Sequence, residues 1–292
     1  MSARTEKHDG SAVGAGQLYV VATPIGNLDD IGLRALSTLA RADTIAAEDT
    51  RVTARLLERH HLEGKLFPVH EHNERRAAER IVEQLAQGKN VALVTDAGTP
   101  GVADPGAVVV AMARAAGFRI VPIPGPNAAV TALSAAGLRQ APFLFFGFLP
   151  PKSAARRKAL AGLRPLPYML VFYEAPHRIV ESVEDISAMI GADRTLVLAR
   201  ELTKVFEEIH RCALGAAAGW LRENPDRQRG EFVLIVEGAE SAESSVEWEP
   251  VLSALLAEMP LVRAVKLTCS ITGAKRKAVY ARALSLESTV DG

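Results

Sequence analysis

The stretch VALVTDAGTPGVADPG, residues 91–106, joins a purely apolar run to a loop of Gly, Pro, Thr and Asp that has no long polar side chain. An apolar run of this kind predicts a buried strand. Glycine lets a ligand approach the backbone closely, and proline holds a turn rigid. The stretch therefore predicts a strand that ends in a ligand-facing loop.

Two further junctions repeat the pattern in the first half of the chain: YVVATPIGN at 19–27 and FRIVPIPGPNA at 118–128. In open α/β sheets, ligands bind where loops leave the carboxyl ends of the strands. A single loop of this composition is more often just a tight turn between a strand and a helix. Three of them together favour one shared ligand cleft.

Apolar runs alternate with helical patterns through the first half of the chain, which predicts right-handed βαβ units and a largely parallel sheet. We expect strands at 17–22, 43–47, 66–69, 90–95 and 118–122, and helices at 30–41, 51–61, 74–87, 106–116 and 127–137. Gly88 and Gly117 follow two of these helices as C-terminal caps. Residues 17–138 are therefore predicted to form an N-terminal α/β domain.

A second α/β domain is predicted at 139–238, where FLFFGFLP (143–150) reads as a buried strand that opens it. Further strands are expected at 168–173, 194–199 and 231–237, with helices at 152–162 and 176–190. Residues 239–249 are acidic and rich in Ser, as linkers are. Residues 250–292 are expected to form a small basic element of two or three helices, and residues 1–16 a disordered tail.

The composition is that of an ordinary soluble protein. The chain has 292 residues, 48% of them hydrophobic, with 34 basic residues against 34 acidic ones. This charge balance neither demands nor excludes nucleic acid. Two cysteines exclude a disulfide framework, and the first 16 residues lack the apolar core of a signal peptide. No apolar stretch reaches membrane-spanning length. We therefore expect a cytoplasmic protein that has no membrane partner.

Eight blocks of sequence resemble, in order, the signature blocks of one family. They are ATPIGNLDDI (22–31), EDTRVTARLL (48–57), LVTDAGTPGVADPG (93–106), PGPNA (124–128), GFLPPK (147–152), YEAPHR (173–178), RELTKVFEE (200–208) and GEFVLIVEG (230–238). The family is the bacterial 16S ribosomal RNA small-subunit methyltransferases I, a branch of the tetrapyrrole methylase-like enzymes. The chain departs from the family's usual residues at Val102, Ala103, Asn127 and Ala175.

The resemblance implies two α/β lobes of the tetrapyrrole methylase type with a cofactor cleft between them, usually in a homodimer. It implies S-adenosyl-L-methionine as the methyl donor and the ribose 2′-hydroxyl of a cytidine in the decoding region of 16S rRNA as the acceptor. The partner would be 16S rRNA or the small ribosomal subunit. The residues that it assigns to the methyl-donor site are Pro24, Ile25, Asp96, Ala97, Gly98, Thr99, Pro100, Asn127 and Ala128.

A ribose hydroxyl is a poor nucleophile unless a positioned base takes its proton or a cation meets its developing charge. Candidates lie in EDTR (48–51), YEAPHR and RELTKVFEE. Any one of them taken alone is more often part of a structural ion pair or a helix cap. The clustering of acid, base and aromatic favours Glu174 and Lys204, with Arg178 beside them. The sequence leaves the identity of the base open.

Two basic patches could bind an RNA backbone. The first is Lys152, Arg156, Arg157 and Lys158, and the second is Lys275, Arg276 and Lys277, within a segment from Arg263 to Leu286 that has six basic residues and no acidic one. Either patch could instead be a solvated helix face. The histidines at 60, 61, 70 and 72 lack the spacing of a ligand set, so no metal site is expected.

Three other functions remain open at this stage. A small-molecule methylase that acts on a tetrapyrrole would share the fold, but the basic C-terminal segment and the EDTR and YEAPHR blocks favour RNA. A nicotinamide dehydrogenase would need Gly-x-Gly-x-x-Gly in the first turn, where the chain has Thr-Pro-Ile-Gly-Asn. A non-catalytic RNA-binding module would not account for the three loops that are predicted to form a ligand cleft.

Overall fold

The computed structural model describes residues 16–138, 142–239 and 248–287. The predicted N-terminal tail, apart from Gly16, and residues 240–247 of the predicted linker lie outside the described residues.

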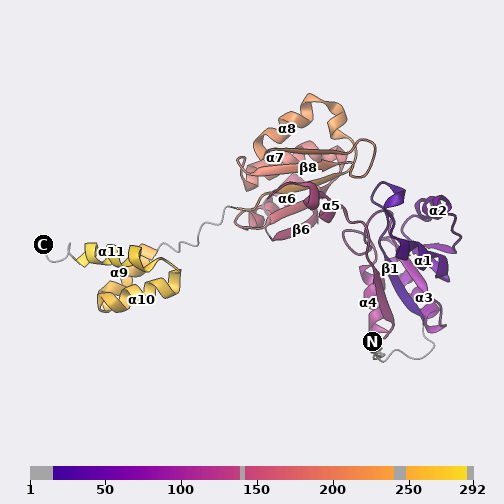
Figure 1. The fold of residues 1–292 in the computed structure, drawn as a ribbon, viewed down its shortest axis with the longest axis horizontal. Coiled ribbons are helices and arrows are strands. Elements are labelled where there is room, and N and C mark those ends of the chain that lie inside the picture. The colour runs from indigo at the N-terminus through magenta and orange to yellow at the C-terminus, as the bar shows by residue number, and fades with distance from the viewer. Residues whose placement is uncertain (1–15, 139–141, 240–247, 288–292) are drawn as a thin grey trace, which may run out of the picture. The chain divides into compact units, whose positions relative to one another are not determined.

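Five strands form the first sheet, in the order β3-β2-β4-β1-β5; strand β1 carries its label in Figure 1. They are β1 (Gln17–Val21), β2 (Thr44–Ala47), β3 (Leu66–Pro68), β4 (Val91–Val94) and β5 (Arg119–Ile123). Every neighbouring pair is parallel, which confirms the predicted parallel sheet. The carboxyl ends of β1, β4 and β5 therefore lie at one edge of the sheet, next to each other.

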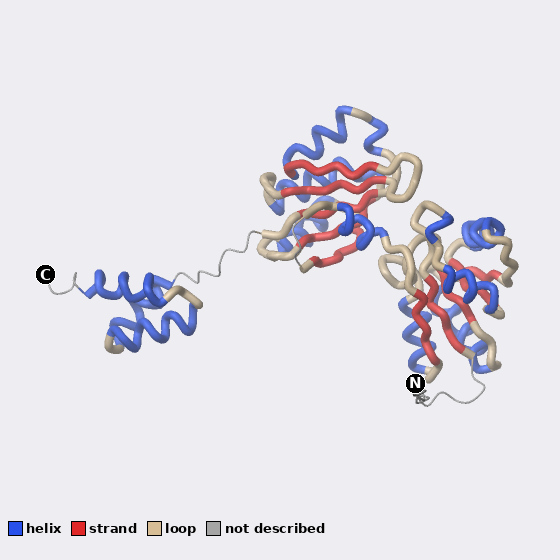
Figure 2. Tube along the Cα trace, in the orientation of Figure 1, coloured by secondary structure: helices blue, strands red, loops and turns tan. Residues whose placement is uncertain are grey.

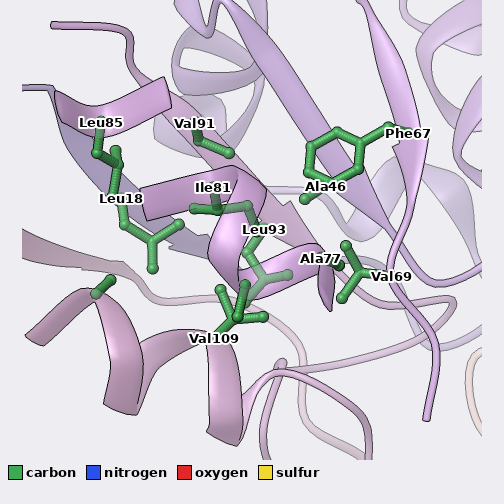
Figure 3. Packing of buried hydrophobic residues seen from close by; sticks show 12 residues of the cluster. Leu18, Ala46, Phe67, Val69, Ala77, Ile81, Leu85, Val91, Leu93 and Val109 are labelled. Carbon is green, nitrogen blue, oxygen red and sulfur yellow. The ribbon is translucent and has the colours of Figure 1, made fainter. Parts of the chain in front are cut away.

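Helices cover both faces of this sheet: α1 (Leu33–Arg41), α2 (Thr50–Arg59), α3 (Glu74–Ala86) and α4 (Ala107–Ala115). Successive strand residues point to opposite faces, so β4 contributes to two cores. On one face, Leu93 packs with Ile81 of α3 and Val109 of α4 (Figure 3). On the other face, Val94 packs with Leu39 of α1. The unbroken apolar run of β4 is the signature of a strand that is buried on both sides.

The second sheet is mixed, in the order β6-β7-β10-β8-β9. Its strands are β6 (Phe143–Phe148), β7 (Met169–Glu174), β8 (Thr195–Arg200), β9 (Glu208–Ala213) and β10 (Phe232–Val236). Only β6 and β7 are parallel. The strand predicted at 143–150 is present as β6, but its predicted burial is wrong, because β6 lies at the edge of the sheet and exposes Phe143, Phe146 and Phe148.

The helices that follow the first sheet are α5 (Ala128–Ala135), α6 (Ser153–Leu163), α7 (Ile179–Ile190) and α8 (Leu214–Glu223). Short 3-10 turns lie between β1 and α1 (η1, Leu28–Asp30), before α7 (η2, Pro176–Arg178) and after α8 (η3, Pro225–Gln228). Helix α5 packs on the second sheet, where Ala129 and Ala132 share a core with Val171, Val197 and Val233. By packing, α5 thus belongs to the second sheet although it precedes the predicted domain boundary at 138.

The C-terminal residues form a compact unit of their own, together with Pro165–Pro167. Its described residues contain three helices, α9 (Trp248–Glu258), α10 (Leu261–Thr272) and α11 (Arg276–Glu287), drawn in blue in Figure 2. Leu252, Val265 and Val279 lie in its core, one from each helix. Gly273 ends α10 in the left-handed conformation, with φ of 71°. The helical C-terminal element that the sequence predicts is therefore present in the described residues.

Candidate active site in a cavity of the α/β unit

A cavity of about 270 Å³ lies in the α/β unit and draws its walls from both halves of that unit. All three predicted cleft loops contribute: the first supplies Ile25, the second Ala97 to Thr99, and the third Asn127 and Ala128. The second sheet and its loops supply ten more, which are Phe148, Tyr173, Glu174, Ala175, Pro176, Ala199, Leu202, Glu231, Phe232 and Val233. Val102 and Asp104 complete the wall.

The three loops are held together by their own hydrogen bonds. Thr23 and Gly98 exchange two backbone hydrogen bonds, of 2.8 and 3.0 Å, and the Thr23 hydroxyl donates to the Thr95 carbonyl at 3.0 Å. The Thr99 hydroxyl donates to the Pro126 carbonyl at 3.3 Å. Gly98 has φ of 81°, a conformation that glycine adopts without strain. Hydrogen bonds within the protein therefore hold this edge of the cavity in place.

Six of the nine residues that were predicted to bind the methyl donor line the cavity: Ile25, Ala97, Gly98, Thr99, Asn127 and Ala128. Pro24, Asp96 and Pro100 do not line it. Asp96 holds the neighbouring loop instead. Its carboxylate accepts the backbone N–H of Asp49 at 2.9 Å, and its own N–H donates to Glu48 at 3.2 Å.

Asn127 begins α5 as its N-cap, because its side chain accepts the backbone N–H of Val130 at 3.1 Å. The backbone N–H of Ala129 donates to the Tyr173 hydroxyl at 3.2 Å, which ties the first turn of α5 to β7. The cap thus fixes where α5 begins, and the bond to Tyr173 holds that beginning against β7 at the cavity.

Glu174 lies in the cavity wall, but its carboxylate is fully engaged. It accepts hydrogen bonds from Arg178 Nε at 2.7 Å, from the Ala175 N–H at 2.8 Å and from the Ser182 hydroxyl. Its side chain is completely buried, and Arg178 is not among the residues that line the cavity. The ion pair of Glu174 and Arg178 thus holds the end of β7 in place, and such a structural ion pair is the commoner role that the sequence predicts for these residues.

Lys204 is not among the lining residues either. Its Nζ donates to Glu201 and to Glu231, at 2.8 Å each. Burial disfavours the ammonium, yet these two carboxylates outweigh it and raise the Lys204 pKa above its ordinary value. A lysine that stays protonated at neutral pH is a cation and not a base. The loop that contains Leu202 and Lys204 lies close to Gly26: a Cβ added to Gly26 would be 2.9 Å from the Leu202 carbonyl oxygen.

Asp104, at the end of the stretch quoted first, was not recognised as a site residue from the sequence. It lines the cavity. Burial, and in smaller measure the nearby carboxylates of Glu48, Asp96 and Glu231, raise the pKa of its carboxyl to about 7. The sequence signal was only its presence in a ligand-facing loop, which it shares with several neighbours.

The prediction that the first basic patch binds RNA is wrong for one of its four residues. Arg156 is completely buried and forms an ion pair with Asp185 at 2.7 Å, so it is not available to an RNA phosphate. A helix places residues three and four positions apart on one face, and here that face packs against α7. Lys152, Arg157 and Lys158 are exposed.

In the second patch, Lys275, Arg276 and Lys277 are all exposed at the start of α11. None of the three forms an ion pair with another residue of the described ranges. Across those ranges, no group of three or more His, Cys, Asp or Glu side chains is placed to hold a metal ion. The described helices also include none that is long and apolar enough to cross a membrane.

Residues 17–218 match the tetrapyrrole (corrin/porphyrin) methylases, and residues 242–287 match the RsmI C-terminal HTH domain. The chain is 48% identical to ribosomal RNA small subunit methyltransferase I of Escherichia coli O157:H7, with 96% of this chain and 98% of that protein covered. It is 47% identical to the protein of the same name from Pseudomonas aeruginosa, with 92% and 97% covered.

Solved structures with the same fold include the methyltransferase CobJ, with a TM-score of 0.60, 22% identity and coverage of 77% of this chain and 95% of that one. Cobalt precorrin-4 methyltransferase CbiF has a TM-score of 0.58 at 16% identity, with 76% and 94% covered. These likenesses confirm the two-lobed fold. The length and level of the sequence matches decide the family: the chain belongs to the tetrapyrrole methylases, in the branch of ribosomal RNA small subunit methyltransferase I.

Proposed function

We propose that the protein transfers a methyl group from S-adenosyl-L-methionine to the ribose 2′-hydroxyl of a cytidine in the decoding region of 16S rRNA. The protein is a methyltransferase by family, and the proposal adds the acceptor. One observation carries it: the 48% identity, over nearly the full length of both chains, to a relative named ribosomal RNA small subunit methyltransferase I.

The lining of the cavity fits the methyl donor. Its volume of about 270 Å³ lies just below the ~300–1,000 Å³ typical of small-molecule sites. Thr99 and Ala128 would hold polar groups of the donor through their backbone N–H groups, and Gly98, which has no side chain, would let the donor lie close to the backbone. Ile25, Leu202 and Val233 offer apolar wall to its adenine ring. When bound, S-adenosyl-L-methionine supplies a methyl carbon that is activated by a positively charged sulfur.

The protein's own contribution to this reaction is mainly to hold the methyl donor and the acceptor in position. An in-line displacement is accelerated when donor and acceptor are held in a near-attack geometry. The hydrogen bonds between the loops of Thr23 and Gly98 fix one part of the cavity wall, and the hydrogen bond from Ala129 of α5 to Tyr173 fixes another. The apolar side chains of the cavity exclude water that could compete for its polar groups.

A tetrapyrrole is the alternative acceptor, since CobJ and CbiF share the fold. At 22% identity or less this likeness extends to the fold alone. The exposed cations at Lys275, Arg276 and Lys277 favour a polyanion, because each cation that meets a phosphate releases a counterion and so adds affinity. RNA therefore remains the preferred acceptor.

The proposal includes 16S rRNA or the small ribosomal subunit as partner, a cytoplasmic location and a homodimer. Val205 and Phe206 support the homodimer, since their exposed fractions of 93% and 70% are high for large apolar side chains. Sedimentation at micromolar concentration should give a dimer, and Phe206→Asp should shift it toward monomer. A wild-type protein that stays monomeric would remove the dimer from the proposal.

The acceptor is tested with a methyl donor labelled on its methyl group. The protein is incubated with small ribosomal subunits, with naked 16S rRNA made without modification, or with a free tetrapyrrole. Label should enter RNA and survive alkali in a dinucleotide, since a methylated 2′-oxygen cannot attack the neighbouring phosphate. Label on the tetrapyrrole, or on a base of the RNA, would contradict the proposed acceptor.

A further inference from the structure

Three carboxylates line the cavity, and two of them are occupied. Glu174 accepts three hydrogen bonds, and Glu231 is paired with Lys204. The carboxylate of Asp104 has no hydrogen bond and no ion pair to any residue in the part of the chain that the structure describes. It is thus the cavity carboxylate whose lone pairs are available to a substrate.

We propose that Asp104 is the general base that takes the proton of the acceptor hydroxyl, an inference that rests on the methyl transfer proposed above. The earlier candidates fit this task less well. Lys204 is held protonated by two carboxylates, and Glu174 would have to give up hydrogen bonds that hold β7 and η2 in place.

The charged groups near Asp104 come from three other segments. They are Glu48 at the end of β2, Asp96 after β4 and Glu231 before β10, all carboxylates. The Tyr173 phenol of β7 is also close enough to sense the charge of Asp104. Together with burial, the carboxylates bring the Asp104 pKa to about 7, where a general base is most effective at physiological pH.

The step balances with these groups alone. As the ribose oxygen attacks the methyl carbon, an O–C bond forms and the C–S bond of the donor breaks, with its electron pair left on sulfur. The hydroxyl proton passes to the Asp104 carboxylate. The products are a methyl ether, a neutral thioether and a carboxylic acid, and solvent later removes the proton from that acid.

Asp104→Asn keeps the size of the side chain and removes the base. We expect unchanged affinity for S-adenosyl-L-methionine by calorimetry and a kcat lower by about 100-fold or more, the usual contribution of a positioned base. The wild-type kcat should rise with pH and level off above about 7, and the variant should lack this step. Asp104→Glu should recover part of the rate together with the pH dependence. Asp193→Asn, at an exposed position outside the cavity lining, is the matched control.

Two results would overturn the assignment. Asp104→Asn could keep the wild-type rate and pH profile, or it could lose affinity for the donor and keep the pH step, which would make Asp104 a donor-binding residue. Failure of the proposed function looks different, since wild-type protein would then leave 16S rRNA unlabelled. Circular dichroism on each variant separates these outcomes from loss of the fold.

Discussion

Gly98 lies where two loops are hydrogen-bonded to each other and where the backbone lines the cavity. A Cβ added there would be 3.7 Å from Ile25 and 3.9 Å from the Pro126 carbonyl oxygen, so space for one carbon exists. Gly98→Val adds branches beyond that carbon and forces a non-glycine residue to φ of 81°. We expect donor affinity to fall about tenfold or more, as ~1–2 kcal/mol of strain and lost contacts would give. Calorimetry measures this.

Gly117→Val is the matched control. Gly117 has φ of 82° and nothing within 4 Å of an added Cβ, and it is not among the residues that line the cavity. The variant carries the same backbone strain and should lose stability but keep its affinity for the donor. Equal affinities in the two variants would exclude Gly98 from the donor site.

Asp104 also affects stability, with a predictable sign. Its folded pKa of about 7 exceeds the ordinary 3.8, so the stability it contributes is present below pH 3.8 and lost as pH rises through 7. Asp104→Asn never ionises. Calorimetric melting should therefore show a Tm about 2–4 °C higher than wild type at pH 8, or ~1 kcal/mol after allowance for solvent screening, and no difference near pH 4. An equal Tm at both pH values would show that the carboxyl is not shifted.

The residues of the site were predictable to the extent that local chemistry defines them. Gly98 and Asn127 follow from turn geometry and helix capping, which depend on a few neighbouring residues. Asp104 could not be recognised, because what distinguishes it is its surroundings, three carboxylates contributed by separate loops. Arg156 was misassigned for a related reason, since a run of basic residues does not reveal which side of a helix is covered.

Within α6, neighbouring basic residues should behave oppositely. Arg156→Ala leaves Asp185, whose side chain is 4% exposed, with Arg157 and Ser153 as its remaining partners. The loss should be about 3 kcal/mol of unfolding free energy in urea, the lower end for a broken buried pair. Lys158→Ala, on the exposed face, should stay within about 0.5 kcal/mol of wild type. Equal losses in both variants would contradict the buried role of Arg156.

The exposed cations of α11 should contribute to RNA affinity. Changing Lys275, Arg276 and Lys277 to Ala in the full chain should weaken rRNA binding and reduce the slope of log K against log salt by about 2–3, close to one per lost phosphate contact. Filter binding at several salt concentrations measures the slope. Donor affinity should not change.

A second triple variant distinguishes direct contact with RNA phosphates from the long-range effect of the protein's net charge. Lys65, Arg75 and Arg76 are exposed on the first lobe, and their replacement by Ala removes the same three charges. Its slope should remain close to that of the wild type. If both triple variants reduced the slope equally, α11 would not contact RNA and its charge would act only at long range.

Elements were predictable where periodicity is strong. Strands β2 and β4, in the interior of the first sheet, are buried on both faces and therefore read as nearly continuous apolar runs. Strand β9 was missed because EIHRCA, at an edge, alternates half-buried and exposed side chains and has no apolar run. In β6 the opposite occurred: its phenylalanines predict burial, but an edge position leaves three of them exposed.

At the scale of the whole molecule, periodicity predicts the first sheet, but it does not predict that the cavity wall combines both halves of the α/β unit. Ile25 and Ala128 come from before residue 139, whereas Tyr173, Leu202 and Val233 come from after it. Contacts between residues so far apart in the chain leave no local pattern. The ordered signature blocks supplied this information instead, because a family resemblance carries the whole three-dimensional arrangement at once.

The packing of α5 limits how such proteins can exchange parts. A chimera of two relatives that crosses over at residue 138 would join the α5 of one parent to the second sheet of the other, and so place foreign side chains opposite Ala129 and Ala132. A crossover at Pro124 or Gly125 would carry α5 along with the sheet on which it packs. Recombination in the laboratory or in evolution should therefore yield folded hybrids more often when the exchanged piece begins just before Asn127, the N-cap of α5. Hybrids that cross over at residue 138, the domain boundary predicted from the sequence, should fold less often.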